Sequence, residues 1–312
     1  VEDIVIEMLR NARDAGADKV YLATTKEDGV RTLVFLDNGS GVPQDMQERI
    51  FDARVTSKLE SMKMDRWGVH GRGMALFSIK QNTDEARVVA SDVDLGSVFK
   101  VSVATDRLGE RADQSSWPQA VKDEDGHYVC ARGPHNIIRA ACEFALEELR
   151  TCDVYLGSPS EIAATLHAQA SSRLDASRLL FIDDEAELPV IDRLGLASDA
   201  EDFIRICSGL GLEMSERTAH RILAGQIKPV RGVTARLLRE RDSSSHASAP
   251  VDLAKDRRGL RIAKDDMAQF SRAVERDFND LASRYYLNLC GDPKIRVSRD
   301  RITVTFDLAK EE

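Results

Sequence analysis

The alternation of apolar and polar positions divides the first 104 residues into short helices and strands. Residues 1–16 repeat with a helical period, which predicts an amphipathic helix. Its apolar positions are Ile4, Met8, Leu9 and Ala12. Aliphatic runs bounded by turn residues predict four strands, 19–24, 31–37, 86–92 and 97–104. Helices are also expected near 44–52 and over GMALFSIKQN. Residues 53–72 have no clear period, and a mobile loop is expected there.

Beyond residue 104 the pattern changes from one region to the next. Residues 105–135 are polar, with scattered Gly, Asp and Ser, which predicts a linker or a long excursion. Residues 136–194 alternate between helical and strand patterns. The predicted helices are 137–151 and 159–172, and the predicted strands are DVYLG and RLLFID. The tetrapeptide SPSE that begins at Ser158 favours a helix start, because a capping Ser, a Pro and a Glu stand at suitable positions.

The last part of the chain is predicted to contain two helical regions separated by a linker. Residues 195–242 have a helical pattern, and SSSHASAP (243–250) has the composition of a linker. The segment 251–312 predicts a long amphipathic helix followed by two strands in KIRVSRDRITVTFDL. The helix carries an apolar stripe that is typical of core packing or a helix–helix contact: Met267, Phe270, Val274, Phe278, Leu281 and Tyr285.

Composition narrows the class of protein. The 312 residues suffice for two or three domains, and 42% hydrophobic with 31% charged residues is typical of a globular protein. No apolar run is long enough for a membrane span. The five cysteines are widely spaced without a CxxC pair, which predicts neither a zinc site nor a disulfide framework and favours a cytoplasmic location. A net charge of −9 argues against a uniformly basic surface for nucleic acids.

The predicted first helix places three polar side chains on one face. Glu7, Asn11 and Asp14 follow one another at steps of four and three residues. A solvated face is one interpretation. The other is that these groups converge on a charged ligand, because the carboxamide oxygen of Asn11 suits Mg²⁺ and the Glu7 carboxylate can take a proton from a water that attacks a phosphate.

Two glycine-containing turns follow this helix. In DNGSGV, Asp37 ends a predicted strand, where it could accept a hydrogen bond from an amino group such as that of adenine; a plain hairpin turn is the alternative. In GVHGRG (68–73), closely spaced glycines lead directly into a predicted helix. Such a turn is a ready anion site, because free backbone N–H groups point toward the ligand.

In this order and spacing, the three segments resemble a known family. EMLRNARDAGA, DNGSGV and GVHGRGMALFSI resemble the three nucleotide-binding boxes of the GHKL ATPases. VTSKLE (55–60) also resembles the lid segment of the MutL branch. The three segments together also resemble the B subunit of type IIB topoisomerases. The resemblance covers residues 1–104. It implies an α+β Bergerat-fold sandwich that binds ATP and Mg²⁺. The patterns after residue 104 predict α/β and helix-turn-helix-like segments.

The resemblance also implies a role for each matched position. Glu7 would be the general base, Asn11 the Mg²⁺ ligand and Asp37 the reader of adenine. The other ATP-binding positions implied by the resemblance are Asp14, Gly39, Gly41, Thr56, Ser57, Lys58, Gly68, Gly71, Arg72, Gly73, Met74 and Ser97. Thr56, Ser57 and Lys58 would belong to the lid. Met74 stands where MutL has an acidic residue.

A second signal lies in residues 199–241. SERTAHRILAG reads as a helix that begins at a Ser and stops at a Gly, and it resembles the recognition half of a helix-turn-helix. Seven basic residues and one acid lie between 217 and 241, a concentration suited to phosphate neutralisation. The expected DNA contacts are Ser215, Arg217, Thr218, Arg221, Lys228 and Arg231. The alternative is a helical subdomain whose basic face is solvated or packed on an acidic surface.

Together these patterns and the resemblance predict a Mg²⁺-dependent ATPase, and the resemblance implies that its turnover is slow. The resemblance implies that its lid closes on ATP and that closure drives a conformational change or dimerisation, in a process related to DNA. Two alternatives stay open at this point. One is an ATP-sensing, DNA-binding transcription regulator with little hydrolysis, and the other is a chaperone-like clamp on proteins.

Overall fold

The computed structural model describes two compact units, Val1–Ser245 and His246–Glu312. The described residues of the first unit are 1–53, 55, 63–65, 68–70, 74–174 and 184–238. Those of the second unit are 270–271, 274–275, 278, 287–289, 293–297, 302–306 and 308–310. The predicted strand RLLFID and the linker 243–250 lie outside these residues.

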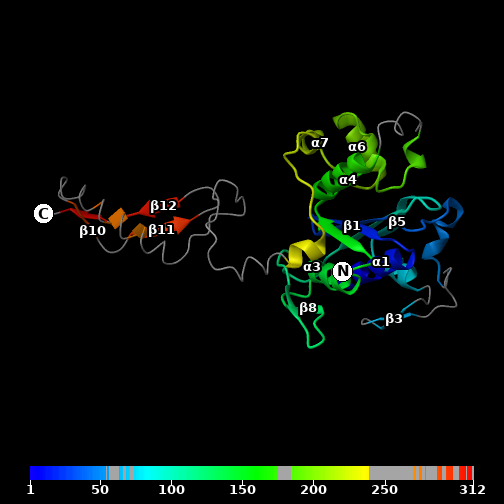
Figure 1. Cartoon of the computed structure of the whole chain (residues 1–312), viewed down its shortest axis with the longest axis horizontal. Helices are drawn as coiled ribbons and strands as arrows, with labels where there is room; N and C mark the ends of the chain where they lie inside the picture. Colours follow the sequence, from blue (N-terminus) through cyan, green and yellow to red (C-terminus); the bar gives the residue numbers. More distant parts are fainter. Residues whose placement is uncertain are drawn as a thin grey trace. The chain divides into compact units, whose positions relative to one another are not determined.

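A five-stranded sheet forms the centre of the first unit (Figure 1), in the order β5-β6-β2-β1-β9. Its strands are β1 (Lys19–Glu27), β2 (Val30–Asp37), β5 (Glu85–Ser91), β6 (Ser97–Ala104) and β9 (Asp153–Gly157). Neighbouring strands are antiparallel except β9, which runs parallel to β1. Asp28 and Gly29 both have positive φ, as the tight hairpin turn between β1 and β2 requires.

One face of the sheet is covered by three helices, α1 (Glu2–Asp14), α2 (Ala75–Asn82) and α3 (Ile137–Glu147). Leu22 of β1 and Leu33 of β2 lie beneath them, fully buried. Residues 233–238, also helical, belong to the same core through Val233 and Leu237. This arrangement makes α1 part of a rigid layer, so its outward polar side chains are held in fixed positions.

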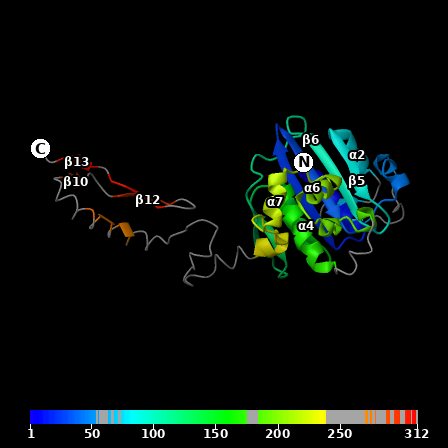
Figure 2. The ribbon, with the colours of Figure 1, turned by 90° about the horizontal axis from the view of Figure 1, so that it is seen from above.

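The opposite face carries a second helical layer, formed by α4 (Pro159–Arg173), α6 (Ala200–Gly209) and α7 (Glu216–Leu223). Figure 2 looks onto this layer, with the sheet behind it. Tyr21 and Leu36 point to this side, whereas their chain neighbours Leu22 and Phe35 point to the other. Because both faces are buried, β2 has an almost continuous apolar sequence rather than an alternating one.

Three sequence predictions are corrected here. The helix expected near 44–52 is two short 3₁₀ turns, Gln44–Met46 and Arg49–Phe51, in which only Phe51 is buried. Within the segment expected to be a loop, β3 (Lys63–Asp65) and β4 (Gly68–His70) pair antiparallel.

The third correction concerns residues 105–135, expected to be a linker or excursion. They contain a hairpin of β7 (Gln119–Lys122) and β8 (Tyr128–Arg132), whose Ala120 and Cys130 belong to the first core. Asn136 fixes the preceding loop, because its amide donates to Asp113 O and Ser116 O. The first unit therefore runs through the boundary predicted at residue 104.

The second unit contains two small antiparallel pairs. β11 (Lys294–Val297) pairs with β12 (Ile302–Thr305), which confirms the predicted hairpin. β10 (Leu287–Leu289) pairs with β13 (Leu308–Lys310), which the sequence pattern does not predict as a separate strand. Phe278 of the predicted stripe is helical and stacks on Phe306, with ring centroids 4.0 Å apart. Met267, Leu281 and Tyr285 lie outside the described residues.

Helices long and apolar enough to cross a bilayer are absent from the part of the chain that the structure describes.

Candidate functional site

The polar face of α1 is ordered by an ion pair within the helix. Arg10 Nη1 donates to Glu7 Oε1 over 2.6 Å. The Arg10 side chain is 5% exposed, whereas the Glu7 side chain is 32% exposed. Glu7 therefore lies at the boundary between the protein interior and the open side of the helix, held by a buried cation.

Asn11 has a hydrogen-bonding group without a partner. Its Nδ2 atom is buried and makes no hydrogen bond. Every other buried side-chain nitrogen or oxygen atom of the described residues has a hydrogen-bond partner. Leaving such a group unpaired costs roughly 1–3 kcal/mol. An unsatisfied amide in a close-packed layer calls for an explanation, and a ligand, an ion or a water that completes it is one.

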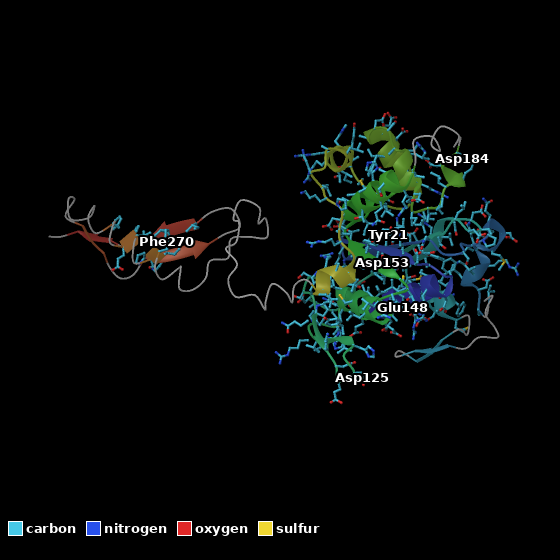
Figure 3. The ribbon with its side chains drawn as sticks, in the orientation of Figure 1. Tyr21, Asp125, Glu148, Asp153, Asp184 and Phe270 are labelled. Atoms are coloured by element: carbon cyan, nitrogen blue, oxygen red, sulfur yellow. The ribbon has the colours of Figure 1, made fainter. Side chains whose placement is uncertain are left out.

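Asp14 lies one turn after Asn11, at the end of α1. Its Oδ1 accepts a hydrogen bond from Arg13 Nε at 3.3 Å, and Arg13 Nη1 donates to Glu148 at 3.2 Å. Glu148, labelled in Figure 3, is the residue after α3. These contacts fix the end of α1 against α3 and leave Asp14 only 13% exposed.

Asp37 ends β2 and is almost completely buried, at 3% exposure. Its carboxylate accepts hydrogen bonds from Gly39 N, at 2.8 Å, and from Ser97, which lies opposite it in β6. Burial raises the pKa of Asp37 to about 6, although these hydrogen bonds act to lower it. A carboxylate kept in the interior at this cost is a candidate acceptor for a specific donor group.

The loop after Asp37 is clamped between α1 and the turn that joins β5 to β6. Ser40 N donates to Ala15 O over 2.9 Å. Gly41 has φ +70°, and a Cβ there would lie 1.8 Å from Asp92 O. Gly96 has φ +78°, and its Cβ would lie 2.1 Å from Asp37 O. No side chain fits at either position, so the glycines are required for this close approach.

Residues 1–91 match a family model described as histidine kinase-, DNA gyrase B- and HSP90-like ATPase. The matched segment contains the polar face of α1, Asp37 and both glycine turns. This part of the chain belongs to the GHKL superfamily. The family assignment confirms the predicted α+β fold for this part and makes ATP the expected ligand of the GHKL domain.

Known proteins similar to the GHKL domain are DNA mismatch repair MutL proteins. That of Thermodesulfovibrio yellowstonii is 33% identical over 98 residues, which cover 30% of this chain and 18% of the relative. That of Pediococcus pentosaceus is 30% identical over 115 residues, covering 36% and 17%. The matched region therefore spans less than a fifth of these relatives.

A solved structure, the catalytic domain of histidine kinase ThkA, overlaps 33% of this chain and 64% of its own, with 17% identity and a TM-score of 0.26. Because its TM-score and its sequence identity are both low, this structural match does not support the superfamily assignment.

The structure brings part of the predicted ATP site together. Glu7, Asn11 and Asp14 share one side of α1, and the Ser40–Ala15 contact joins them to the Asp37 loop. Met74 directly precedes α2 and is 41% exposed, and Gly68 pairs with Asp65 in the small hairpin. The positions that lie outside the described residues are Thr56, Ser57, Lys58, Gly71, Arg72 and Gly73.

Sequence reasoning missed two contributors to the GHKL site. Arg10 lies within the helix motif EMLRNARDAGA. It was missed because hydrogen-bond acceptors were the signal sought in that motif, and an arginine is only a donor. Ser91 accepts from Val42 N at 2.7 Å and donates to Gly96 O at 2.8 Å, so one hydroxyl joins the two glycine loops. Nothing in the local sequence indicates that role, because its partners are distant in the chain.

The predicted DNA-contacting residues lie on and after α7. Arg217, Arg221, Lys228 and Arg231 are exposed. An open depression on α7 is lined by Glu216, Arg217, His220, Arg221, Ala224 and Gln226. The other two predicted contacts are engaged in capping, because Ser215 accepts from Thr218 N and the two hydroxyl oxygens lie 3.0 Å apart.

The basic segment is divided by the fold. Arg236 does not join the exposed arginines: its guanidinium lies 4.1 Å from the centroid of the Trp117 ring, and it donates to Leu156 O. Arg239 and Arg241 lie outside the described residues. The basic surface is therefore smaller than the seven residues that the sequence suggests.

Proposed function

We propose that the GHKL domain binds Mg-ATP and hydrolyses it slowly. The observation that carries this proposal is the unpaired Asn11 amide, one turn from Glu7 on a helix whose end is joined to the loop after buried Asp37. A purely structural helix face gains nothing from an orphaned amide and an almost fully buried carboxylate. A complex of Mg²⁺ and a nucleotide that spans the two supplies a partner to each.

Asp37 is assigned to adenine recognition. Its carboxylate accepts from Gly39 N and Ser97, and it retains lone pairs for the adenine amino group. Gly39, Gly41 and Ser97 form the surrounding wall. The phosphate side is assigned to Asp14, Gly68, Met74 and the positions predicted for the lid and the second glycine turn.

Asn11 is assigned to Mg²⁺. Its orphaned amide fits this role, because a carboxamide presents its oxygen to a hard cation by a half-turn about its last bond, and Mg²⁺ takes few protein oxygens. The bound cation would neutralise charge on the phosphates. This chain's contribution is to keep the amide buried and available.

Glu7 is assigned as the general base. Its carboxylate takes a proton from water as the water oxygen bonds to the γ-phosphorus and the bond from that phosphorus to the bridging oxygen breaks. The products are ADP and phosphate. Closure of the lid and dimerisation of the chain would accompany nucleotide binding, and sedimentation with and without a non-hydrolysable ATP analogue measures the latter.

Two variants test the assignment. Glu7→Gln should reduce phosphate release about a hundredfold or more while the ATP dissociation constant stays within twofold of wild type. Asn11→Ala should remove the Mg²⁺ dependence of nucleotide affinity. Unchanged phosphate release in Glu7→Gln rejects hydrolysis at this site. If the ATP affinity of the wild type is the same with and without a chelator of Mg²⁺, the assignment of Asn11 to the cation is rejected.

A second proposed activity is contact with duplex DNA through α7 and the segment after it. Four exposed cations support it: Arg217, Arg221, Lys228 and Arg231. Each phosphate contact contributes roughly −0.9 to the slope of log affinity against log salt. The variant with both Arg217→Gln and Arg221→Gln should therefore flatten that slope by about 2, whereas Arg87→Gln, on edge strand β5, should not.

The same measurement separates the alternatives. DNA binding with almost no phosphate release indicates a nucleotide-sensing regulator. ATP turnover without salt-sensitive DNA binding indicates a clamp on protein clients.

A further inference from the structure

Arg10 is a charged residue of α1 that sequence reasoning did not use. It is 4% exposed, in a layer otherwise formed by aliphatic side chains such as Val5 and Leu9. A guanidinium stays protonated in proteins, so its burial is costly unless a carboxylate or other acceptors compensate it. Glu7 supplies such compensation at 2.6 Å.

The pair has an asymmetric environment. Arg10 approaches from inside the layer, and the hydrogen bond engages Oε1 of Glu7. The Glu7 side chain keeps 32% of its surface exposed, so the carboxylate is anchored at one oxygen while part of it faces the open side of α1. A carboxylate held in this way has lost most of its freedom to rotate before any substrate arrives.

We propose that Arg10 is a positioning residue that fixes the Glu7 carboxylate for proton transfer. This inference rests on the proposed role of Glu7 as general base. Arg10 touches neither the water nor the phosphate in this scheme. It acts by fixing one carboxylate oxygen, which leaves the other oriented toward the attacking water.

A structural ion pair in the same unit provides the contrast. On α3, Arg139 Nε donates to Glu143 Oε1 at 2.8 Å, and both side chains are largely buried, at 11% and 13% exposure. Arg139 also donates to the backbone oxygens of Cys130 and Gly133, which ties β8 to α3. Arg139 thus ties two elements of the fold together, whereas the partner of Arg10 keeps 32% of its side chain exposed.

The experiment compares Arg10→Met and Arg10→Lys in the full chain, each in the wild-type and the Glu7→Gln background. Steady-state hydrolysis of radiolabelled ATP at several ATP concentrations gives kcat and KM. Arg10→Met should lower kcat about tenfold with KM within twofold of wild type, because the carboxylate loses its anchor. Arg10→Lys should lower kcat only about threefold, since an ammonium can still donate to Oε1. In the Glu7→Gln background both substitutions should change the residual rate by less than twofold.

A second readout does not need turnover. In the nucleotide-free protein, the melting-temperature shifts of Glu7→Gln and Arg10→Met should not add in the double variant, because both act on the same contact: the first removes its charge and the second its donor. Arg139→Met is the matched control: it should lower the melting temperature, and its effect should add to that of Glu7→Gln.

The outcomes separate the inference from the function on which it rests. An equal loss of rate from Arg10→Met in both backgrounds, or a rise in KM of tenfold, assigns Arg10 to the fold and overturns the inference. Wild-type turnover in Glu7→Gln overturns the proposed function instead. If Arg10→Met does not fold, Arg10→Lys decides, because its expected loss of about threefold must vanish when Glu7 is replaced.

Discussion

The two helical layers cover the same sheet but differ in how completely their polar groups are satisfied. The second helical layer, formed by α4, α6 and α7 and named the outer layer, has a side-chain cap at the start of each helix: Ser158, Asp199 and Ser215. The layer that contains α1 holds the orphaned Asn11 amide. Next to this layer, at the end of the central strand β2, Asp37 is a carboxylate with a raised pKa.

This difference indicates where stability is given up for a ligand. An unpaired buried amide destabilises a nucleotide-free domain by roughly 1–3 kcal/mol. Complete caps and an apolar interface do the opposite. The outer layer should therefore respond to substitution through the free energy of unfolding, and the α1 side chiefly through nucleotide binding.

Truncating Phe203 gives the largest expected change. Its ring is fully buried on α6, 5.5 Å from that of His167 on α4. Phe203→Ala should lower the free energy of unfolding by about 3–5 kcal/mol, because a large cavity forms in the outer layer. Urea denaturation measures this. If the folded variant also binds ATP more than threefold more weakly, the outer layer does not act through stability alone, and the proposed difference between the layers is wrong.

The pH dependence of stability at Asp37 comes next. Its pKa rises from 3.8 in the unfolded chain to about 6 in the folded one, so the folded state binds the proton more tightly. The resulting stabilisation is complete below pH 3.8 and is lost as the pH rises through about 6. It amounts to about 3 kcal/mol in full, and about 1.4 kcal/mol between roughly pH 7.5 and roughly pH 5.

Asp37→Asn is the reference for that measurement. The stability of wild type relative to this variant should increase as the pH falls, when both are unfolded with urea across the window. A constant difference would mean that the Asp37 carboxylate is not held in the interior as described.

Asp37→Asn should also weaken ATP binding about 10- to 100-fold near neutral pH, because a buried acceptor for the adenine amino group is replaced by an amide that also donates. Wild-type affinity should itself fall as the pH drops through about 6, when the carboxylate takes up a proton. Titration calorimetry with a non-hydrolysable analogue measures both. Equal affinities for wild type and variant would remove Asp37 from the nucleotide site.

The smallest effect is expected at Ser215. Its hydroxyl caps α7 by accepting from Thr218 N. Ser215→Ala should cost about 1 kcal/mol of unfolding free energy, and leave ATP affinity unchanged. A DNA affinity that falls several-fold while the helix stays intact would instead give this hydroxyl a role in recognition.

Local patterns predicted much of the first unit. The period of α1, the Asp28-Gly29 turn and the start of α4 at Ser158 each depend on residues within a few positions of one another. The capping box at Ser158 is present with both of its hydrogen bonds. The helix expected near 44–52 was wrong, since so few of its residues have a buried surface to pack on.

The candidate site was predicted in part for the same reason. The spacing of Glu7, Asn11 and Asp14 is enough to place them on one face of a helix. Asp37 ends a strand that the run of apolar residues before it predicts. By itself the sequence determined these elements, the order of the glycine turns and hence the superfamily, because each is encoded by neighbouring residues.

Only the tertiary structure decided which distant residues meet. It placed β9 parallel to β1, turned Arg236 onto Trp117 instead of toward solvent, and buried Arg10 against the half-exposed Glu7. These outcomes depend on the packing of segments far apart in the chain, where the burial of apolar surface determines which polar groups are enclosed and which partners they find.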